Sequence, residues 1–70
     1  MQHPEVMTDD ELRAWDWRAD LKADERTIPW LARQTNRSQN TVYLYSWGKV
    51  KPQIEWLREV ARILGKDVAA

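Results

Sequence analysis

Apolar residues recur every three or four positions along most of the chain after its first seven residues. This spacing places them on one face of a helix, and Thr8 and Glu11 show the capping-box pattern that opens helices. The pattern predicts a first helix over about residues 9–24, preceded by a tail over residues 1–7. The apolar face of this helix would consist of Leu12, Trp15, Trp17, Ala19 and Leu21.

Two shorter helices are predicted next, separated by a brief turn. Thr27 suits the N-cap of a helix over about residues 28–34, and Ser38 suits the N-cap of a helix over about residues 39–47. Between them, Asn36 tolerates the left-handed backbone conformation that a tight turn requires.

A last helix is predicted after Pro52, which interrupts the chain. Its apolar spacing indicates about residues 53–64, and Gly65 follows directly. Gly48 likewise follows the preceding helix, so both glycines of the chain lie at predicted helix C-caps. We therefore expect an all-α fold, a small domain of four to five helices over residues 8–70.

Composition narrows the function. The chain has 70 residues, enough for one small domain. It has no cysteine and one histidine, which excludes a disulfide framework, a thiolate metal site and a histidine cluster. No stretch has the roughly 18 consecutive apolar residues of a membrane span, and the N-terminus lacks the features of a secretory signal. We expect a soluble cytoplasmic protein of a bacterial host, without membrane contact, catalytic residues, metal or cofactor.

Charge is distributed unevenly along the chain. No acidic residue occurs from Arg26 to Ile54, whereas residues 1–25 hold eight acids and three bases, so the net charge of zero is two opposite blocks cancelling. A local cationic strip of this kind is typical of a surface that binds a polyanion. The cations of this acid-free window are Arg26, Arg33, Arg37, Lys49 and Lys51.

The helix over residues 39–47 has two different sides. Val42 and Tyr45, flanked by Thr41 and Ser46, are predicted to face the core. The opposite side has no charge at all, which is unusual for a solvated helix face. Its amides can bond an adenine edge in the major groove and its apolar side chain can contact a thymine methyl, although amide-rich faces also bind loops or proteins. The predicted base-reading residues are Gln39, Asn40, Tyr43 and Leu44.

Cations surround this uncharged side. Arg33 and Arg37 lie before the helix, and Lys49 and Lys51 lie after it. We expect these four side chains to hold the phosphates that flank the bases being read.

A set of residues at fixed spacings, without insertions or deletions, occurs in the same region. It comprises Leu31-Ala32, Ser38, Thr41-Val42, Gly48 at 17 positions after Leu31, Pro52, and the run from Val60 to Gly65. In this order the series resembles the Cro and phage-repressor type of helix-turn-helix domain, the lambda-repressor-like or XRE class, with the helix-turn-helix over about residues 27–47.

The resemblance implies roles for individual residues. Gln39, Asn40 and Leu44 would occupy base-facing positions. Backbone phosphates would be approached by Ser38, Thr41, the region of Trp47 and the helix start at Thr27. Ile28 departs from the family, which often has a phosphate-contacting Gln there. Further departures are Asn36 and Arg37 in the turn, and Leu21 and Ser46 in place of a buried Arg–Glu pair.

Two features of the chain allow more than one interpretation. Asp16, Asp20 and Asp24 would form an acidic ridge on the first helix, which we interpret as solvated or as a contact for a protein partner, and not as a catalytic or metal site. The last helix carries a second apolar row, Trp56, Val60 and Ile63. Either the first helix with Val6 and Met7 covers this row, or the row forms a homodimer contact.

These observations predict a function. We expect a Cro-like, sequence-specific transcriptional regulator of phage or mobile-element origin that reads a double-stranded DNA operator with the helix over residues 39–47, with a homodimer on DNA as one arrangement. The alternative is a protein-binding module, antitoxin-like or an anti-host factor, that uses the acidic first helix and Trp-rich surfaces.

Overall fold

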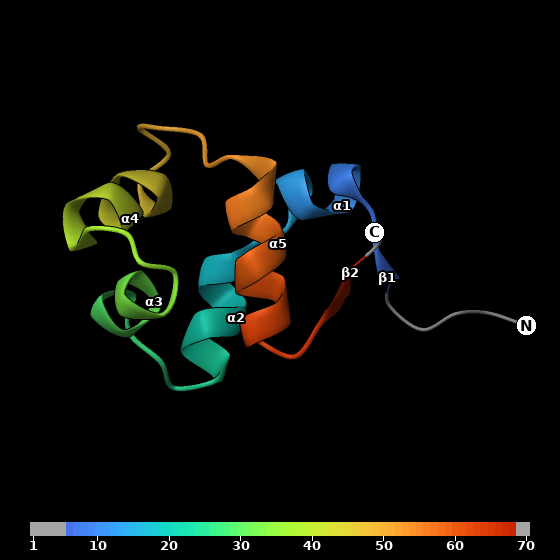
Figure 1. Cartoon of the computed structure of the whole chain (residues 1–70), viewed down its shortest axis with the longest axis horizontal. Coiled ribbons are helices and arrows are strands. Elements are labelled where there is room, and N and C mark those ends of the chain that lie inside the picture. Colours follow the sequence, from blue (N-terminus) through green and yellow to red (C-terminus); the bar gives the residue numbers. More distant parts are fainter. Residues whose placement is uncertain (1–5, 69–70) are drawn as a thin grey trace, which may run out of the picture.

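The computed structural model of the protein describes residues 6–68, and residues 1–5 and 69–70 lie outside the described part. The fold is all-α, as predicted, with the helices arranged around one core (Figure 1). In chain order the elements are β1 (Val6–Met7), α1 (Asp9–Ala14), α2 (Trp17–Ala23), α3 (Ile28–Gln34), α4 (Gln39–Ser46), α5 (Ile54–Ile63) and β2 (Asp67–Val68).

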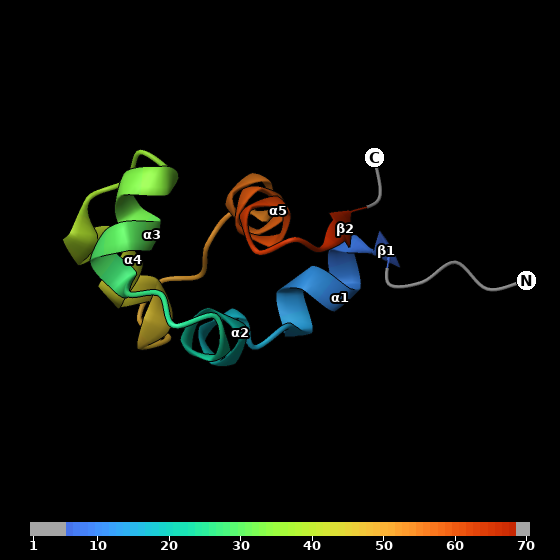
Figure 2. The ribbon, with the colours of Figure 1, turned by 90° about the horizontal axis from the view of Figure 1, so that it is seen from below.

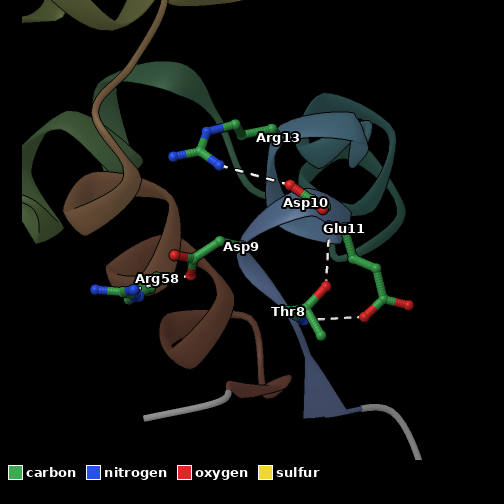
Figure 3. A network of polar contacts seen from close by, with 6 residues as sticks. All are labelled: Thr8, Asp9, Asp10, Glu11, Arg13 and Arg58. Atoms are coloured by element: carbon green, nitrogen blue, oxygen red, sulfur yellow. Dashed lines mark hydrogen bonds and ion pairs between the residues drawn. The ribbon is translucent and has the colours of Figure 1, made fainter.

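Local side-chain caps begin four of the helices. Thr8 forms the predicted capping box, because its backbone N–H donates to Glu11 Oε1 at 2.9 Å and its own Oγ1 accepts from the Glu11 N–H at 3.3 Å (Figure 3). Thr27 and Ser38 cap α3 and α4 as expected. The starts and ends of α3, α4 and α5 therefore agree with the sequence prediction to within one residue.

The predicted first helix is wrong as a single element, because the chain breaks at Trp15 and Asp16. Trp15 has extended backbone angles, and the Asp16 side chain caps α2 by accepting from the Ala19 N–H. In an unbroken helix, Trp15 and Trp17 would be about 200° apart and could not both face one core. The break buries Trp17 and half-buries Trp15, and it leaves Ala19 exposed, contrary to its predicted place on the apolar face.

Helices α2 to α5 all end in the same backbone motif. At the end of α2, the Arg26 N–H donates to the Leu21 carbonyl at 3.0 Å and the Glu25 N–H donates to the Lys22 carbonyl at 2.9 Å, the paired bonds of a Schellman motif. The residue after each C-cap has a left-handed backbone conformation. The sequence predicted this for α3, α4 and α5 but not for α2. The four residues and their φ angles are Glu25 (58°), Asn36 (56°), Gly48 (74°) and Gly65 (83°).

The core centres on Trp56 of α5, which is 1% exposed. The ring of Trp17 from α2 meets Trp56 edge to face at 5.2 Å between centroids, and Tyr45 from α4 does so at 4.8 Å. Three helices therefore meet at one indole. The buried apolar residues are Leu12, Trp17, Leu21, Leu31, Ala32, Val42, Trp56, Leu57, Val60 and Ala61.

The second apolar row of α5 belongs to this core. Trp56 and Val60 are almost completely buried within a single chain, and Ile63 is half-buried. Helix α1 packs against α5, and Met7 packs against the core, as one of the two interpretations of this row expected. Trp56 and Val60 therefore have no surface to offer a second copy, and their assignment to a dimer contact is wrong.

The two ends of the described chain lie side by side. β1 pairs in parallel with β2, with Val6 opposite Asp67 and Met7 opposite Val68. The predicted tail is therefore corrected at Val6 and Met7, which form a strand, while its first five residues lie outside the described part. Beside this pair, Arg58 Nη2 lies 2.8 Å from Asp9 Oδ1 and joins α5 to α1 (Figure 3).

Helices α3 and α4 occupy the opposite end of the molecule from α1 (Figures 1 and 2). Residues 35–38 join them, and Thr35 in this turn is buried, with its hydroxyl donating to the Leu31 carbonyl at 2.9 Å. In the part of the chain that the structure describes, no helix is long and apolar enough to cross a membrane.

The left-handed backbone at Glu25 provides a stability test. Replacing Glu25 with Gly removes the clash of the β-carbon in this conformation, and we expect the free energy of unfolding to rise by about 0.5–1 kcal/mol. Urea denaturation measures this change. The matched control, Glu25→Ala, keeps the β-carbon and should leave stability close to that of the unmodified protein. Equal stability of the two variants would contradict the assignment.

The position of Trp56 provides a second test. Trp56→Ala would empty the centre of the core, and we expect a loss of about 3–5 kcal/mol, comparable to the whole stability of so small a domain. Trp47→Ala is the control, because Trp47 is 63% exposed and its removal should change stability by less than about 0.5 kcal/mol. Thermal unfolding followed by circular dichroism distinguishes the two, and similar losses would argue against the described core.

Candidate nucleic-acid interface

Helix α4 is held in a defined orientation by its cap and by its inner side. Ser38 Oγ accepts from the Thr41 N–H at 3.1 Å and donates to Thr41 Oγ1 at 2.8 Å, which fixes the first turn. Val42 is fully buried, Ser46 is buried, and Tyr45 packs on the core indole. The side of α4 that was predicted to face inward does so.

The opposite side of α4 faces outward, as predicted. Gln39 and Asn40 are exposed, and neither side chain forms a hydrogen bond with another residue in the range 6–68. Tyr43 and Leu44 are half-buried, and the Tyr43 ring lies 5.6 Å from the ring of Trp47, one turn further on. Two exposed carboxamides thus lie on the same side of α4 as Leu44 and a pair of aromatic rings. We call these five residues the uncharged face.

Four cations lie in the segments just before and just after α4. Arg33 is in the last turn of α3, Arg37 is in the turn before α4, and Lys49 and Lys51 follow α4. All four are exposed, and none lies within 4.0 Å of a carboxylate among the described residues. Their charge is therefore available to a ligand.

Arg26, the remaining cation of the acid-free window, is engaged within the chain. Its guanidinium lies 4.6 Å from the centroid of the Trp30 ring, and its Nε lies 4.0 Å from Asp24 Oδ2. It is thus partly neutralised, unlike the four cations beside α4.

Three residues predicted to contact phosphates already form bonds within the chain. Thr27 Oγ1 accepts from the Trp30 N–H at 3.3 Å, and the hydroxyls of Ser38 and Thr41 bond each other. These contacts shape the starts of α3 and α4. The three hydroxyls therefore lie at the N-terminal ends of α3 and α4, within the acid-free window of the sequence.

The acidic ridge predicted for the first helix does not form as one row of free carboxylates. The Asp16 side chain caps the start of α2 and lies 3.5 Å from Arg18 Nε, and Asp24 Oδ2 lies 4.0 Å from Arg26 Nε. Asp20 in between accepts from Trp15 Nε1 at 2.5 Å. Asp20 also lies 3.5 Å from Lys66 Nζ. The three acids therefore have separate structural partners, because the break at residues 15 and 16 changes the setting of each.

Sequence reasoning missed a contact between α2 and α4. Arg18 Nη1 donates to the backbone carbonyl of Ser46, 28 positions away. Leu21 of α2 is buried in the core, and the Ser46 hydroxyl of α4 donates to the Tyr43 carbonyl at 2.8 Å. Arg18 joins the two helices, and no short-range signal in the sequence indicates it.

The tryptophans do not form a shared surface. Trp17 and Trp56 are buried, Trp15 and Trp30 are half-buried, and Trp47 is the exposed one. Of the Trp-rich exterior expected for a protein-binding module, one tryptophan is exposed and two are half-buried.

One hollow lies away from the uncharged face. It is an open groove of about 920 Å³ between the α1–α2 corner and the segment joining α4 to α5. Its lining contains aromatic side chains, cations and one acid, Glu55, but no serine, cysteine or histidine to act as a nucleophile or base. Among the described residues there is also no group of three or more His, Cys, Asp or Glu side chains that would hold a metal.

Comparison with known proteins gives no relative from which to transfer a role. The chain matches no protein-family model, no curated protein and no solved structure. The chemistry of the interface therefore has to be argued from its own side chains. These are the carboxamides and aromatic rings of the uncharged face and the unpaired cations around it.

Proposed function

We propose that this protein is a sequence-specific DNA-binding transcriptional regulator that reads an operator through the major groove with α4. The proposal is supported by two features of this region taken together. The outward side of α4 has no charge, and the segments before and after α4 carry exposed cations that are unpaired among the described residues. A face that only met water would be expected to carry charge. A face that meets base edges is better without it, because buried charges without partners are costly.

The side chains of the uncharged face suit base recognition. The exposed amides of Gln39 and Asn40 can each form two hydrogen bonds with an adenine, through its N6 and N7. Leu44 lies one turn further on and can contact a thymine methyl. An eight-residue helix is about 12 Å long, comparable to the width of the major groove.

The cations supply affinity without sequence preference. Arg33 and Arg37 precede α4 and Lys49 and Lys51 follow it, so phosphates on both sides of the bound bases can be neutralised. Bound in this way, the protein would block polymerase or a competing regulator by steric overlap. This mode of action, and a phage or mobile-element origin, follow the Cro-like resemblance of residues 27–64.

A homodimer would allow two half-sites about 34 Å apart to be bound together. Any such dimer must use a surface other than the buried Trp56 and Val60. The protein-binding alternative is less well supported, because its acids have partners within the fold and its tryptophans are mostly covered.

Direct base readout predicts the effect of truncating the amides. On a cognate site selected from random duplexes, Gln39→Ala and Asn40→Ala should each weaken binding by about 1–3 kcal/mol, with little change on scrambled DNA. Fluorescence anisotropy with labelled duplexes measures both. Gln53→Ala is the matched control, because Gln53 is exposed and its side chain forms no cap bond. Unchanged discrimination in both α4 variants would rule out readout by this helix.

Phosphate contact predicts a dependence on salt. The logarithm of the association constant should fall linearly with the logarithm of salt concentration, with a slope of about −0.9 for each phosphate neutralised. Arg37→Gln should reduce the steepness by about one such increment, on cognate and scrambled duplexes alike. Binding that is insensitive to salt would contradict the assignment of these cations to DNA.

A further inference from the structure

Helix α2 and the segment that follows it carry three evenly spaced cations. Arg18, Lys22 and Arg26 are spaced four residues apart, with Arg26 just past the helix end. Each lies two positions after an aspartate. Arg18 Nε lies 3.5 Å from Asp16 Oδ1 and Arg26 Nε lies 4.0 Å from Asp24 Oδ2, while Asp20 lies near Lys66 instead. Two of the three cations therefore have an exposed carboxylate nearby, and Lys22 has none among the side chains that the structure describes.

These three cations line a cleft beside α4. A shallow hollow of about 340 Å³ lies where α2 meets the start of α3 and the end of α4. It is lined by all three cations and by no acid. Its remaining lining residues are Leu21, Thr27, Ile28 and Ser46. We call this hollow the α2 cleft.

Two of the three cations are positioned by contacts within the chain. The Arg18 guanidinium donates to the Ser46 carbonyl and lies 3.5 Å from Asp16 Oδ1, and 56% of its side chain remains exposed. Arg26 lies over the Trp30 ring. Positioned guanidiniums lose little further freedom when they bind an anion, and their planar donors match phosphate oxygens.

The third cation has no partner of its own. Lys22 is exposed, and no carboxylate in residues 6–68 lies within 4.0 Å of it. An exposed ammonium near two guanidiniums adds to the local positive potential. An anion bound among these groups would reduce the repulsion between them. The cleft is therefore suited to an anion.

We propose that the α2 cleft binds a phosphate of the DNA backbone next to the bases contacted by α4. The inference rests on the proposed function and extends it to residues outside the acid-free window. Continuity supports DNA as the source of the phosphate, because Ser46, the last residue of α4, forms part of the cleft wall. A DNA backbone that passes the end of α4 would thus meet cations of α2 and of the segment that follows α2.

Lys22→Gln in the full chain tests the proposal. Lys22 is exposed and makes no ion pair among the described residues, so the fold should be retained, which circular dichroism and the thermal midpoint verify. We expect the salt slope of duplex binding to become shallower by about 0.9, equally on cognate and scrambled DNA. Lys22→Glu should weaken binding further. The control is Arg62→Gln, an exposed cation of α5 outside the cleft, which should leave the slope unchanged.

Three results would overturn the inference, and they are separable from failure of the proposed function. A Lys22→Gln slope equal to that of the unmodified protein would show that the cleft does not contact DNA. An equal loss of slope in both variants would indicate a general effect of net charge. If inorganic phosphate shifts the amide resonances of Arg18 and Lys22 while the DNA slope of Lys22→Gln is unchanged, the cleft holds a free anion only. If the unmodified protein binds no DNA at all, the proposed function itself fails.

Discussion

The packing of α2 and α4 against the indole of Trp56 is the contact on which the other helix positions depend. Trp17 and Tyr45 approach this ring from two different helices. The Trp56 indole N–H has no hydrogen-bond partner in the described structure, a cost of about 1–3 kcal/mol that aromatic packing must offset. Because Tyr45 is held inward, the other side of α4, with Gln39 and Asn40, is turned away from the core.

Some charged residues pair with partners that join helices, and others have no ion-pair partner among the described residues. Asp9 pairs with Arg58, and Asp20 binds both the Trp15 indole and Lys66, so these acids connect α1, α2 and α5. Such partly exposed pairs add little stability individually, but they use up negative charge at the end of the molecule away from α4. The cations around α4 have no such partners, and the positive potential of this end is left to attract a polyanion.

Most helix boundaries were predictable because they depend on neighbouring residues. Thr27 and Ser38 cap helices through bonds that span three positions. The end of α3 is closed by the Asn36 N–H, three positions from its acceptor Arg33, and by the Arg37 N–H, five positions from its acceptor Ala32. The break after α1 was not predictable in the same way. The periodicity of residues 9–24 is compatible with one helix, and only the shape of the core shows that Trp15 and Trp17 must both reach it.

The sequence by itself determined the helix ends after residue 27, the acid-free window and the two sides of α4, because these follow from spacing within one element. The tertiary structure decided what the elements bury and share. It placed Trp56 and Val60 in the core instead of on the surface, and it brought Arg18 to Ser46 to form the α2 cleft. Contacts between residues 28 positions apart have no periodic signature, since they exist only once α2, α4 and α5 have packed on a common indole.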